Sequence, residues 1–397
     1  MKVCVVGLGY IGLPTAALIS SHGIDVLGID ISQSVVDTIN KGDIHIVEPG
    51  LAEVVKSVVA NGKLKASTTP EEADVFVIAV PTPFKEDHQP NLDYIFAAAK
   101  NIAPYIKPGN LIILESTSPV STTEQMKAVL EEANPSLVNE DVHYAFCPER
   151  VLPGNIMAEL VSNSRVVGGL TKMAGEKSKA FYKQFVEGEV FETTARTAEL
   201  CKLVENSFRD VNIAFANELS LICHQENVDV FELIEMANKH PRVNILTPGV
   251  GVGGHCIAVD PWFIIKKNPE HSELIKTGRL VNLKKTDWVV EQIIERIESF
   301  KSKNNAEPKI ACLGLAFKPN IDDLRESPAI DVCEKLLQKG YVINVVEPNI
   351  KDHDKFSLID LEEAKASADL MILLVGHNEF KALSPEDRLL DFCGALR

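Results

Sequence analysis

The chain has 397 residues, of which 45% are hydrophobic and 24% are charged, a composition typical of a globular protein. A chain of this length is too long for one hydrophobic core, so two or three domains are expected. The formal net charge of −16 argues against nucleic acid or an anionic membrane surface as a partner. It does not exclude a small anionic substrate, because a few local cations can outweigh the global balance.

The sequence contains no apolar run of the roughly 20 residues that a membrane helix needs, and it begins with a predicted strand instead of a signal peptide. We therefore predict a cytoplasmic protein that does not contact a membrane. The eight cysteines include no CxxC pair, and the ten histidines form no HxH or HExxH arrangement. The sequence thus predicts neither a disulfide framework nor a metal site.

The N-terminal part alternates apolar strands with helices. Strands are predicted at residues 3–6 and 26–29, with a helix after the first strand, and further buried strands at 75–80 and 111–114. Continuous apolar runs are typical of strands that are covered on both faces. The predicted fold class is therefore α/β, with a doubly wound parallel sheet.

A dinucleotide-binding fingerprint follows the first strand. Gly7 allows the tight turn, Gly9 lets a pyrophosphate approach the backbone, and Gly12 permits close packing of the helix. Asp30, at the end of the next strand, would accept hydrogen bonds from the adenosine ribose and repel a 2′-phosphate. These residues favour NAD over NADP, and a glycine turn in an unrelated α/β unit is a much rarer explanation in this context.

Two threonines lie just past the carboxyl ends of later strands. Thr82 stands in Pro81-Thr82-Pro83, and Thr117 closes Glu115-Ser116-Thr117. Ligands of open α/β sheets bind in the crevice at these strand ends, so both threonines are candidates for cofactor contact. Capping of the following helices explains them equally well.

The middle of the chain is predicted to be helical, from about 197 to 237 and again over 288–300. Lys202, Glu205, Asn206 and Arg209 share one helix face. A solvated charged face is the usual explanation of such spacing, but the mixture of amide, amine and guanidinium beside apolar residues also fits a polar pocket. A polar segment, residues 301–308, is the predicted linker.

The segment 248–261 combines a glycine-rich approach with the sequence Gly254-His255-Cys256 and an acid, Asp260, four residues later. A thiolate is the side-chain nucleophile best suited to attack an aldehyde, provided that its pKa is low and it is accessible. Most cysteines only pack in a core. The dinucleotide fingerprint in the same chain favours the reactive role, in which oxidation proceeds through a thioester.

After the linker the opening pattern returns. Residues 309–316, 340–347 and 368–375 resemble 2–9, 23–30 and 73–80 in the same order. We therefore predict two Rossmann-like parallel-sheet domains joined by a helical middle domain, with boundaries 1–190, 191–300 and 301–397. The second copy lacks the second and third fingerprint glycines, so it is predicted to bind something other than a dinucleotide, or nothing. Lys318 and Arg325, in the loop after its first strand, would suit a diphosphate.

These motifs, in this order and over essentially the whole chain, resemble the UDP-glucose/GDP-mannose 6-dehydrogenase family. The matching strings include Glu115-Ser116-Thr117, Cys147-Pro148-Glu149-Arg150 and Gly253-Gly254-His255-Cys256. Longer strings, such as 44–49, 147–154, 240–246 and 254–263, are most similar to the branch that oxidises UDP-N-acetyl-D-mannosamine. The resemblance implies an NAD-dependent, four-electron oxidation at C6 of the sugar, giving the uronic acid for bacterial surface polysaccharide.

The resemblance also implies roles for individual residues. Cys256 would capture the aldehyde as a thiohemiacetal and carry the thioester. Lys202 would be the general acid/base or would stabilise the alkoxide. Asn206 and Asp260 would position water and oxyanion, and Glu149 would assist hydrolysis. Cofactor contacts would come from Gly7, Gly9, Tyr10, Ile11, Gly12, Asp30, Thr82, Thr117 and Arg325. Substrate contacts would come from Arg150, Val151, Lys202, Asn206, Arg209, His240, Arg242, Gly253, Phe317 and Lys318.

The family resemblance further implies a homodimer formed through the helical middle. Three departures from the family pattern are Ser121, where many relatives have glycine, Val259, where UDP-glucose enzymes have lysine, and the ending Asp391-Phe392-Cys393-Gly394. The alternatives are the same chemistry on UDP-N-acetylglucosamine or UDP-glucose, and a non-catalytic nucleotide-sugar sensor. The presence of both Cys256 and Lys202 argues against the sensor.

Overall fold

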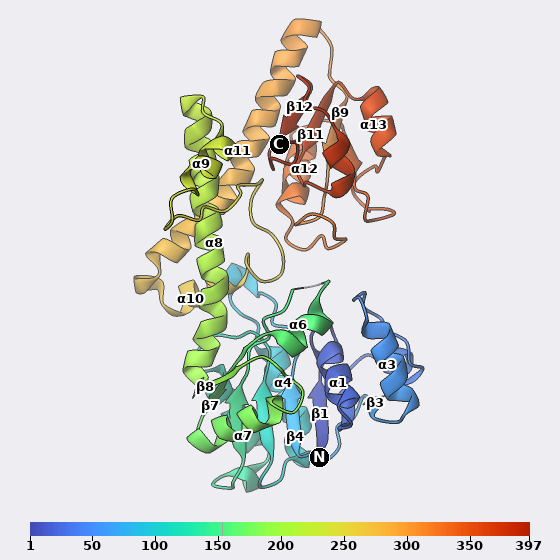
Figure 1. The fold of residues 1–397 in the computed structure, drawn as a ribbon, viewed down its shortest axis with the longest axis vertical. Helices are drawn as coiled ribbons and strands as arrows, with labels where there is room; N and C mark the ends of the chain where they lie inside the picture. The colour runs from blue at the N-terminus through green and yellow to red at the C-terminus, as the bar shows by residue number, and fades with distance from the viewer. Residues whose placement is uncertain (153) are drawn as a thin grey trace. The chain divides into compact units, whose positions relative to one another are not determined.

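The computed structural model describes residues 1–152 and 154–397. These residues form two compact units, Met1–Val204 and Glu205–Arg397, and the boundary falls inside the long helix α8 (Ala195–Glu226). The first unit contains an eight-stranded sheet, drawn in blue to green in Figure 1, and the second contains a four-stranded sheet, drawn in orange to red.

The eight-stranded sheet has the order β3-β2-β1-β4-β5-β6-β7-β8 and is parallel except between β6 and β7. Its inner order is that of a doubly wound dinucleotide-binding sheet, in which the strand order reverses between β1 and β4. The strands are β1 (Lys2–Val6), β2 (Asp25–Ile29), β3 (Leu64–Ser67), β4 (Val75–Ile78), β5 (Leu111–Leu114), β6 (His143–Phe146), β7 (Arg165–Gly169) and β8 (Val190–Thr194).

Side chains alternate between two hydrophobic cores along each central strand. Val3 and Val5 of β1 pack into one core, whereas Cys4 and Val6 pack into the other. The first core is covered by α1 (Gly12–Ser21), α2 (Gln33–Asn40), α3 (Leu51–Ala60), α6 (Ile156–Ser162) and α7 (Lys172–Tyr182), and the second by α4 (Asp93–Ile102), α5 (Thr122–Ala133) and the start of α8. Burial on both faces explains why these strands are continuous apolar runs.

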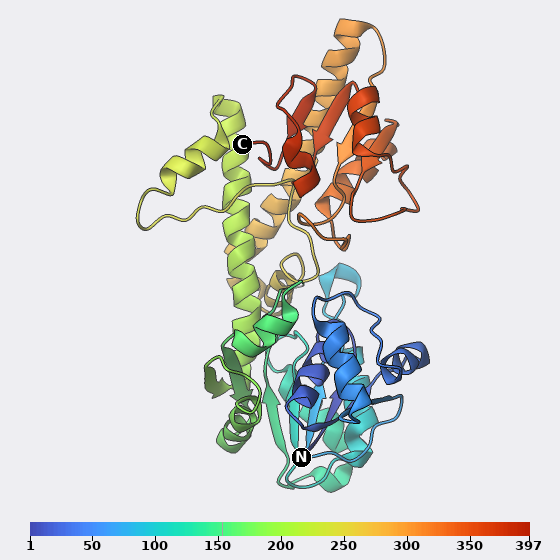
Figure 2. The ribbon, with the colours of Figure 1, turned by 45° about the vertical axis from the view of Figure 1, so that its right-hand side comes forward.

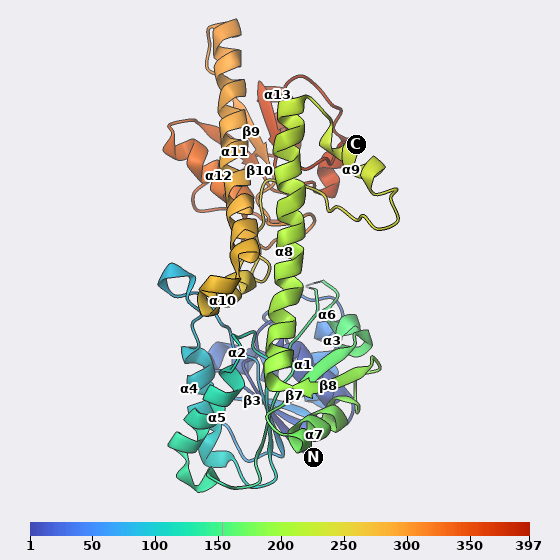
Figure 3. The same cartoon turned by 90° about the vertical axis from the view of Figure 1, so that its left-hand side faces the viewer.

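The second unit joins helices to a small parallel sheet. Its order is β10-β9-β11-β12, and α11 and α12 cover one face while α13 lies on the other. Figure 3 shows α8 and α11 running side by side. The elements are α9 (Val230–Ala237), α10 (Asp260–Lys267), α11 (Glu273–Asn304), β9 (Ile310–Leu313), α12 (Pro328–Gln338), β10 (Ile343–Val346), α13 (Leu361–Ser367), β11 (Leu370–Leu373) and β12 (Leu389–Asp391).

Short 3₁₀ turns complete the secondary structure, at Glu86–His88, Ala103–Tyr105, Pro135–Leu137, Pro269–His271 and Asn378–Ala382. The end of the chain lies beside α9 and α8 (Figure 2). There the Arg397 guanidinium forms an ion pair with the Asp229 carboxylate at the start of α9, and Gly394 packs against the Phe231 ring. Among the helices of the described residues, none has the length and apolar character needed to cross a bilayer.

The predicted fold class is confirmed: two parallel-sheet units of Rossmann type are connected by long helices. The predicted repeat corresponds to equivalent strands, because β1 lies between β2 and β4 as β9 lies between β10 and β11. The predicted linker 301–308 is wrong in its first half, since α11 continues to Asn304. Lys301 bridges Glu298 and Glu307 there, which lets a polar sequence remain helical.

Ser121, the residue that replaces a common family glycine, has a left-handed backbone. Its φ is 75°, it precedes α5, and its side chain forms no capping hydrogen bond. Its N–H donates to the Glu199 carboxylate at 2.6 Å, which holds the turn in this conformation. The left-handed region is unfavourable for any residue with a Cβ and favours glycine. This is the physical reason for a glycine at this position.

We predict that Ser121→Gly stabilises the protein by about 0.5–1 kcal/mol, because it relieves the left-handed strain and removes no cap. Urea unfolding followed by circular dichroism measures the change. The matched control is Ser57→Gly in α3, where glycine is unfavourable by about 0.5–1 kcal/mol. Equal destabilisation by both substitutions would contradict the explanation.

Candidate active site

The glycine-rich turn lies at the switch point of the first sheet, between the carboxyl ends of β1 and β4. Gly7 has a φ of 92°, and a Cβ there would stand 2.6 Å from the Ala79 carbonyl oxygen. A Cβ on Gly12 would stand 1.7 Å from the Gly7 carbonyl oxygen, whereas one on Gly9 would meet no atom within 4 Å. The outer two glycines are thus required by packing, and the middle one leaves the backbone open to a ligand.

Asp30 closes this turn from the end of β2. One carboxylate oxygen accepts a hydrogen bond from the Leu8 N–H (3.1 Å) and the other from the Ser32 N–H (2.9 Å). Each oxygen keeps a lone pair for a ligand hydroxyl. Tyr10 is 45% exposed and Ile11 is half-buried, both at the start of α1. These residues fit a dinucleotide with its ribose at Asp30 and its pyrophosphate at the helix N-terminus.

The two predicted threonines come together beside the turn. The Thr82 hydroxyl donates to the Thr117 carbonyl oxygen at 2.7 Å, which links the segments after β4 and β5. Neither threonine occupies the N-cap of a helix, because α4 follows Leu92 and α5 follows Ser121. The capping alternative is therefore wrong, and cofactor contact stays a prediction.

Glu149 lies after β6 in a buried group of charged side chains. One of its carboxylate oxygens accepts from the Arg165 guanidinium (2.8 Å), and the other accepts from the Arg150 N–H (2.7 Å). The Tyr182 hydroxyl donates to Glu115 at 2.7 Å. Burial raises the pKa of Glu115 to about 7, although the Arg165 guanidinium opposes this shift.

Arg165 and Tyr182 were not predicted as part of the site. The sequence offered one hint, a single arginine at the start of the otherwise apolar strand β7. The sequence pattern alone does not show whether such an arginine is buried or lies exposed at the end of its strand. Arg165 is 4% exposed, and its guanidinium carbon lies 5.0 Å from the centre of the Tyr182 ring. Nearby, Arg150 and Val151 are half-buried, and Arg150 donates to the Ser164 carbonyl oxygen at 3.1 Å.

Lys202 and Asn206 lie four residues apart in α8. Asn206 is buried, and its amide donates to the Asp260 carboxylate at 2.5 Å. Lys202 is half-buried, while Arg209 is exposed. The alternative of a solvated charged face therefore fits Arg209 and does not fit Asn206.

Asp260 begins α10 and connects Asn206 to the cysteine. The Asp260 N–H donates to the Cys256 carbonyl oxygen at 2.8 Å. All eight cysteines lie in the described residues, and Cys256 is the one with an exposed side chain. Next to it, burial and the Arg325 guanidinium lower the pKa of His255, so its imidazole is neutral at neutral pH. The second unit thus presents an accessible thiol whose loop is fixed by a buried carboxylate and amide.

The glycines before the cysteine pack against the loop after β9. A Cβ on Gly253 would lie 2.3 Å from the Glu326 carbonyl oxygen, and the Gly254 N–H donates to the Arg325 carbonyl oxygen at 3.1 Å. The Phe317 ring stands against Gly254. Gly253, Phe317 and Arg325, predicted from separate motifs, are therefore neighbours.

Other predicted contacts from this unit lie at its surface. The Arg325 guanidinium forms an ion pair with Asp323 at 2.6 Å. Lys318 is half-buried, while His240 and Arg242 are exposed in the loop after α9, where the Arg242 N–H donates to the His240 ring at 3.3 Å. Within the second unit, the structure gives no contact that joins His240 or Arg242 to the cysteine loop.

Buried polar side chains between α8 and α11 hold the cysteine loop from the other side. The Arg279 guanidinium binds the Asp210 carboxylate (3.1 Å) and donates to the Ile257 carbonyl oxygen (3.3 Å). Asn282 donates to Asp210 at 2.8 Å and accepts from Asn217 at 2.8 Å. The Asn217 side chain in turn accepts from the Gly249 N–H at 2.9 Å. These residues were missed, because buried polar helix positions resemble solvated ones in a sequence.

The second Rossmann-like unit repeats the acid-closed turn in a different form. Glu347, at the end of β10, accepts from the N–H groups of Leu315 (2.7 Å) and Ala316 (3.0 Å), as Asp30 accepts from Leu8. His377 and Asn349 also bind its carboxylate, each at 3.0 Å. These hydrogen bonds lower the pKa of Glu347 to about 2 despite its burial. Its helix α12 begins only at Pro328, so the turn does not lead directly into a helix N-terminus.

Comparison with known proteins places these features in one family. Residues 1–186 match the NAD binding domain of the UDP-glucose/GDP-mannose dehydrogenase family, residues 196–284 its central domain, and residues 311–391 its UDP binding domain. The chain belongs to this family. It is accordingly an NAD-dependent oxidoreductase, and its C-terminal part is a UDP binding domain. Across the described residues, no three His, Cys, Asp or Glu side chains gather as a metal site would require.

Individual relatives are similar over their whole length. The UDP-N-acetyl-D-mannosamine dehydrogenase of Campylobacter jejuni is 56% identical over 408 residues, covering 99% of each chain. The NDP-N-acetyl-D-galactosaminuronic acid dehydrogenase of Ralstonia solanacearum is 53% identical, covering 98% of this chain and 93% of that protein. The solved structure of the UDP-D-ManNAc dehydrogenase from Pyrococcus horikoshii has a TM-score of 0.92, 39% identity and coverage of 100% and 96%.

Glu347 predicts a specific acid sensitivity. The pKa of Glu347 is lower in the folded protein than its ordinary value near 4.5. At pH values above 4.5 the ionised carboxylate therefore contributes about 3 kcal/mol to the free energy of unfolding, and this contribution is lost as the pH falls toward 2. Glu347→Gln should lower stability at pH 7 and flatten the loss of stability between pH 4.5 and 2. Urea midpoints measured across this range test the expectation. Glu379→Gln, at an exposed position, is the control, and an acid profile of Glu347→Gln like that of the wild type would refute it.

Proposed function

We propose that the protein oxidises UDP-N-acetyl-D-mannosamine at C6 to UDP-N-acetyl-D-mannosaminuronate, for the synthesis of bacterial surface polysaccharide. The observation that carries the chemistry is the accessible Cys256 thiol, in a loop fixed by Asp260 and Asn206, in a chain that also has an NAD binding domain. The substrate is supported by the relatives from Campylobacter jejuni and Pyrococcus horikoshii.

The overall reaction converts one alcohol, two NAD⁺ and one water into a carboxylate, two NADH and three protons. Bound NAD supplies the hydride acceptor for each of the two oxidations. Lys202 takes the proton of the C6 hydroxyl or stabilises the alkoxide that develops there. The chain's fixed contribution at this stage is the helix α8, on which Lys202 and Asn206 stand one turn apart.

The Cys256 sulfur then adds to the aldehyde carbon, forming a C–S bond and a thiohemiacetal that keeps the aldehyde on the protein. Loss of the second hydride from that carbon leaves a thioester on Cys256. Water adds to the thioester carbonyl, with Asn206 and Asp260 orienting the water and oxyanion and Glu149 assisting as base. The C–S bond breaks, and the free thiol and the uronate result.

We further propose the roles that the family pattern assigns to the remaining residues. Cofactor contacts are assigned to the glycine turn, Asp30, Thr82, Thr117 and Arg325. Substrate contacts are assigned to Arg150, Val151, Arg209, His240, Arg242, Gly253, Phe317 and Lys318. The three family matches support a division into an NAD domain (1–190), a helical middle (191–300) and a UDP-sugar domain (301–397). The eight cysteines all lie in the described residues and none forms a disulfide, which supports a cytoplasmic location, where thiols stay reduced.

A second candidate substrate has a specific observation in its favour. The relative from Ralstonia solanacearum carries a name with a galactosamine-derived sugar and is nearly as similar as the mannosamine enzymes. The chemistry at C6 would be the same, and only the sugar stereochemistry would differ. UDP-N-acetylglucosamine and UDP-glucose would undergo the same oxidation and complete the set of candidate substrates.

A substrate panel with NADH stoichiometry tests the proposal. We expect two NADH per sugar with UDP-N-acetyl-D-mannosamine, and much weaker turnover with the N-acetylgalactosamine, N-acetylglucosamine and glucose analogues. Turnover with UDP-glucose alone would refute the substrate, and no NADH with any sugar would favour a sensor. Cys256→Ala should abolish uronate formation because the aldehyde cannot be captured. Cys393→Ser, at a half-buried thiol that binds Asp391, is the matched control and should keep both NADH.

We also propose a homodimer formed through the helical middle. Large apolar side chains are exposed along α8, at Leu200, Val204, Phe208, Phe215 and Ile222, and an apolar row of this kind on a surface helix marks an interaction site. Sedimentation velocity should give twice the 43.5 kDa chain mass. Phe208→Glu/Phe215→Glu should shift the protein to a monomer, while Glu218→Gln on the same helix should not. A monomeric wild type would exclude the dimer.

A further inference from the structure

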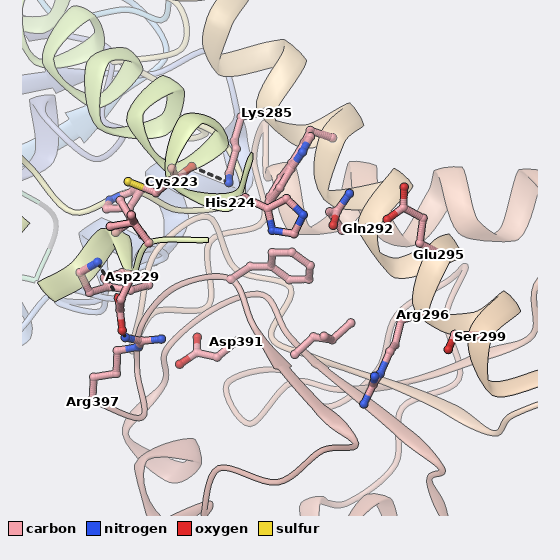
Figure 4. A pocket seen from close by; sticks show the side chains of 18 residues that line it. Cys223, His224, Asp229, Lys285, Gln292, Glu295, Arg296, Ser299, Asp391 and Arg397 are labelled. Carbon is pink, nitrogen blue, oxygen red and sulfur yellow. Dashed lines mark hydrogen bonds and ion pairs between the residues drawn. The ribbon is translucent and has the colours of Figure 1, made fainter. Parts of the chain in front are cut away.

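A cavity of about 440 Å³ lies within the second unit, between α8, α9, α11 and the segment after β12. Apolar side chains, among them Phe231, Trp288 and Phe392, form much of its wall. Lys285, Arg296 and Arg397 reach it from different sides (Figure 4). Its size is that of a small-molecule pocket, and none of the proposed cofactor or substrate residues lines it.

Lys285 is the unusual group of this cavity. Its side chain is 3% exposed, its ammonium donates to the Ser220 hydroxyl at 2.8 Å, and it stands 3.9 Å from the centre of the Trp288 ring. Burial lowers the pKa of Lys285 to about 7. None of the ion pairs found among the described residues includes it, so its buried charge lacks the carboxylate that such lysines usually have.

The acids on the cavity wall are occupied by other groups. One oxygen of Asp229 accepts from the N–H groups of Phe231 and Glu232 at the start of α9, and the other pairs with Arg397. Both oxygens of Asp391 accept backbone N–H groups of the segment that follows it. Glu295 is exposed at the rim. The cavity therefore offers a buried lysine that is only partly protonated near neutral pH, because no anion beside it in the described part of the chain stabilises the ammonium form.

We propose that this cavity binds a small organic anion, with its acidic group on Lys285 and its apolar body against Trp288, Phe231 and Phe392. The apolar wall favours an organic anion over an inorganic one, because phosphate or sulfate has no apolar part that could pack against these side chains. An anion on a buried ammonium forms a charge-assisted hydrogen bond, which is stronger than a neutral one. Arg296 stands at the edge of the cavity, where it adds a second positive charge.

Two fluorescent probes that differ only in charge test the proposal on the wild-type protein. 1-Anilinonaphthalene-8-sulfonate carries an aromatic body and one sulfonate, and N-phenyl-1-naphthylamine is the same body without it. Titrations are run with saturating NAD and UDP, so that the sites of the family's own ligands are filled. We expect the sulfonate to bind at least tenfold more tightly than the neutral probe, the value of a hydrogen bond to a charged group. Equal affinities, or no binding, would overturn the proposal.

Variants locate the binding within the cavity. Lys285→Met keeps an unbranched side chain of similar length and removes its charge, and it should weaken sulfonate binding at least tenfold while leaving the affinity for the neutral probe unchanged. Lys284→Met, the exposed neighbour on α11, is the matched control and should bind as the wild type does. Unaltered sulfonate affinity in Lys285→Met would overturn the assignment to Lys285. Should that variant not fold, Val230→Trp fills the cavity from α9, and persistence of sulfonate binding in it would equally overturn the proposal.

Discussion

The buried ion pair between Asp210 of α8 and Arg279 of α11 is the contact on which the second unit depends. Both side chains are almost fully buried, at 0% and 2% exposed, so neither charge has water as an alternative partner. Burial raises the pKa of Asp210 to about 6, and the Arg279 guanidinium acts against that shift. Loss of one partner of such a pair typically destabilises a protein by about 3–5 kcal/mol. The two long helices therefore have one register in which these charges meet.

This register also fixes the cysteine loop. Arg279 holds the Ile257 carbonyl oxygen, Asn217 holds the Gly249 N–H, and Thr286 donates to the Val250 carbonyl oxygen at 2.9 Å. The loop is glycine-rich and would be costly to order by itself. Its backbone is instead held by side chains of two rigid helices, with Asp260 closing the cysteine end. An exposed thiol is thus combined with a fixed backbone, which is the arrangement that the proposed reaction, two oxidations at one carbon atom, would need.

The two Rossmann-like halves show how one turn can serve different ends. Both begin with a glycine of positive φ, Gly7 and Gly314, and both are closed by a carboxylate. Asp30 accepts one N–H on each oxygen, whereas Glu347 is surrounded by Leu315, Ala316, Asn349 and the His377 ring. The Asp30 carboxylate can still accept a hydrogen bond from a ribose hydroxyl. The Glu347 carboxylate already accepts hydrogen bonds from groups of its own unit on both oxygens. The missing glycines of the second turn agree with this difference.

Local patterns predicted the parts of the site that depend on neighbouring residues in the chain. The fingerprint, Asp30 and the sequence around Cys256 needed only spacing and strand ends, and the contact between Asn206 and Asp260 joins two residues that motifs had identified separately. Arg279, Asn282 and Arg165 could not be found in this way. Their importance arises from burial against distant partners, and one sequence does not distinguish a buried polar side chain from a solvated one. The antiparallel pairing of β7 depends on tertiary packing for the same reason.

Arg165 imposes a last constraint on the first unit. Its guanidinium forms an ion pair with Glu149 and also attracts Glu115. The two buried carboxylates repel each other, which disfavours the state in which both are charged. Burial is the main cause that raises the pKa of Glu115 to about 7, the Arg165 guanidinium opposes this shift and the Glu149 carboxylate adds to it, so near neutral pH Glu115 is partly protonated. Glu149 has one oxygen on Arg165 and the other on the Arg150 N–H, so its carboxylate cannot rotate. In the proposed hydrolysis Glu149 would accept a hydrogen bond from the attacking water, in a position fixed by Arg165 of β7.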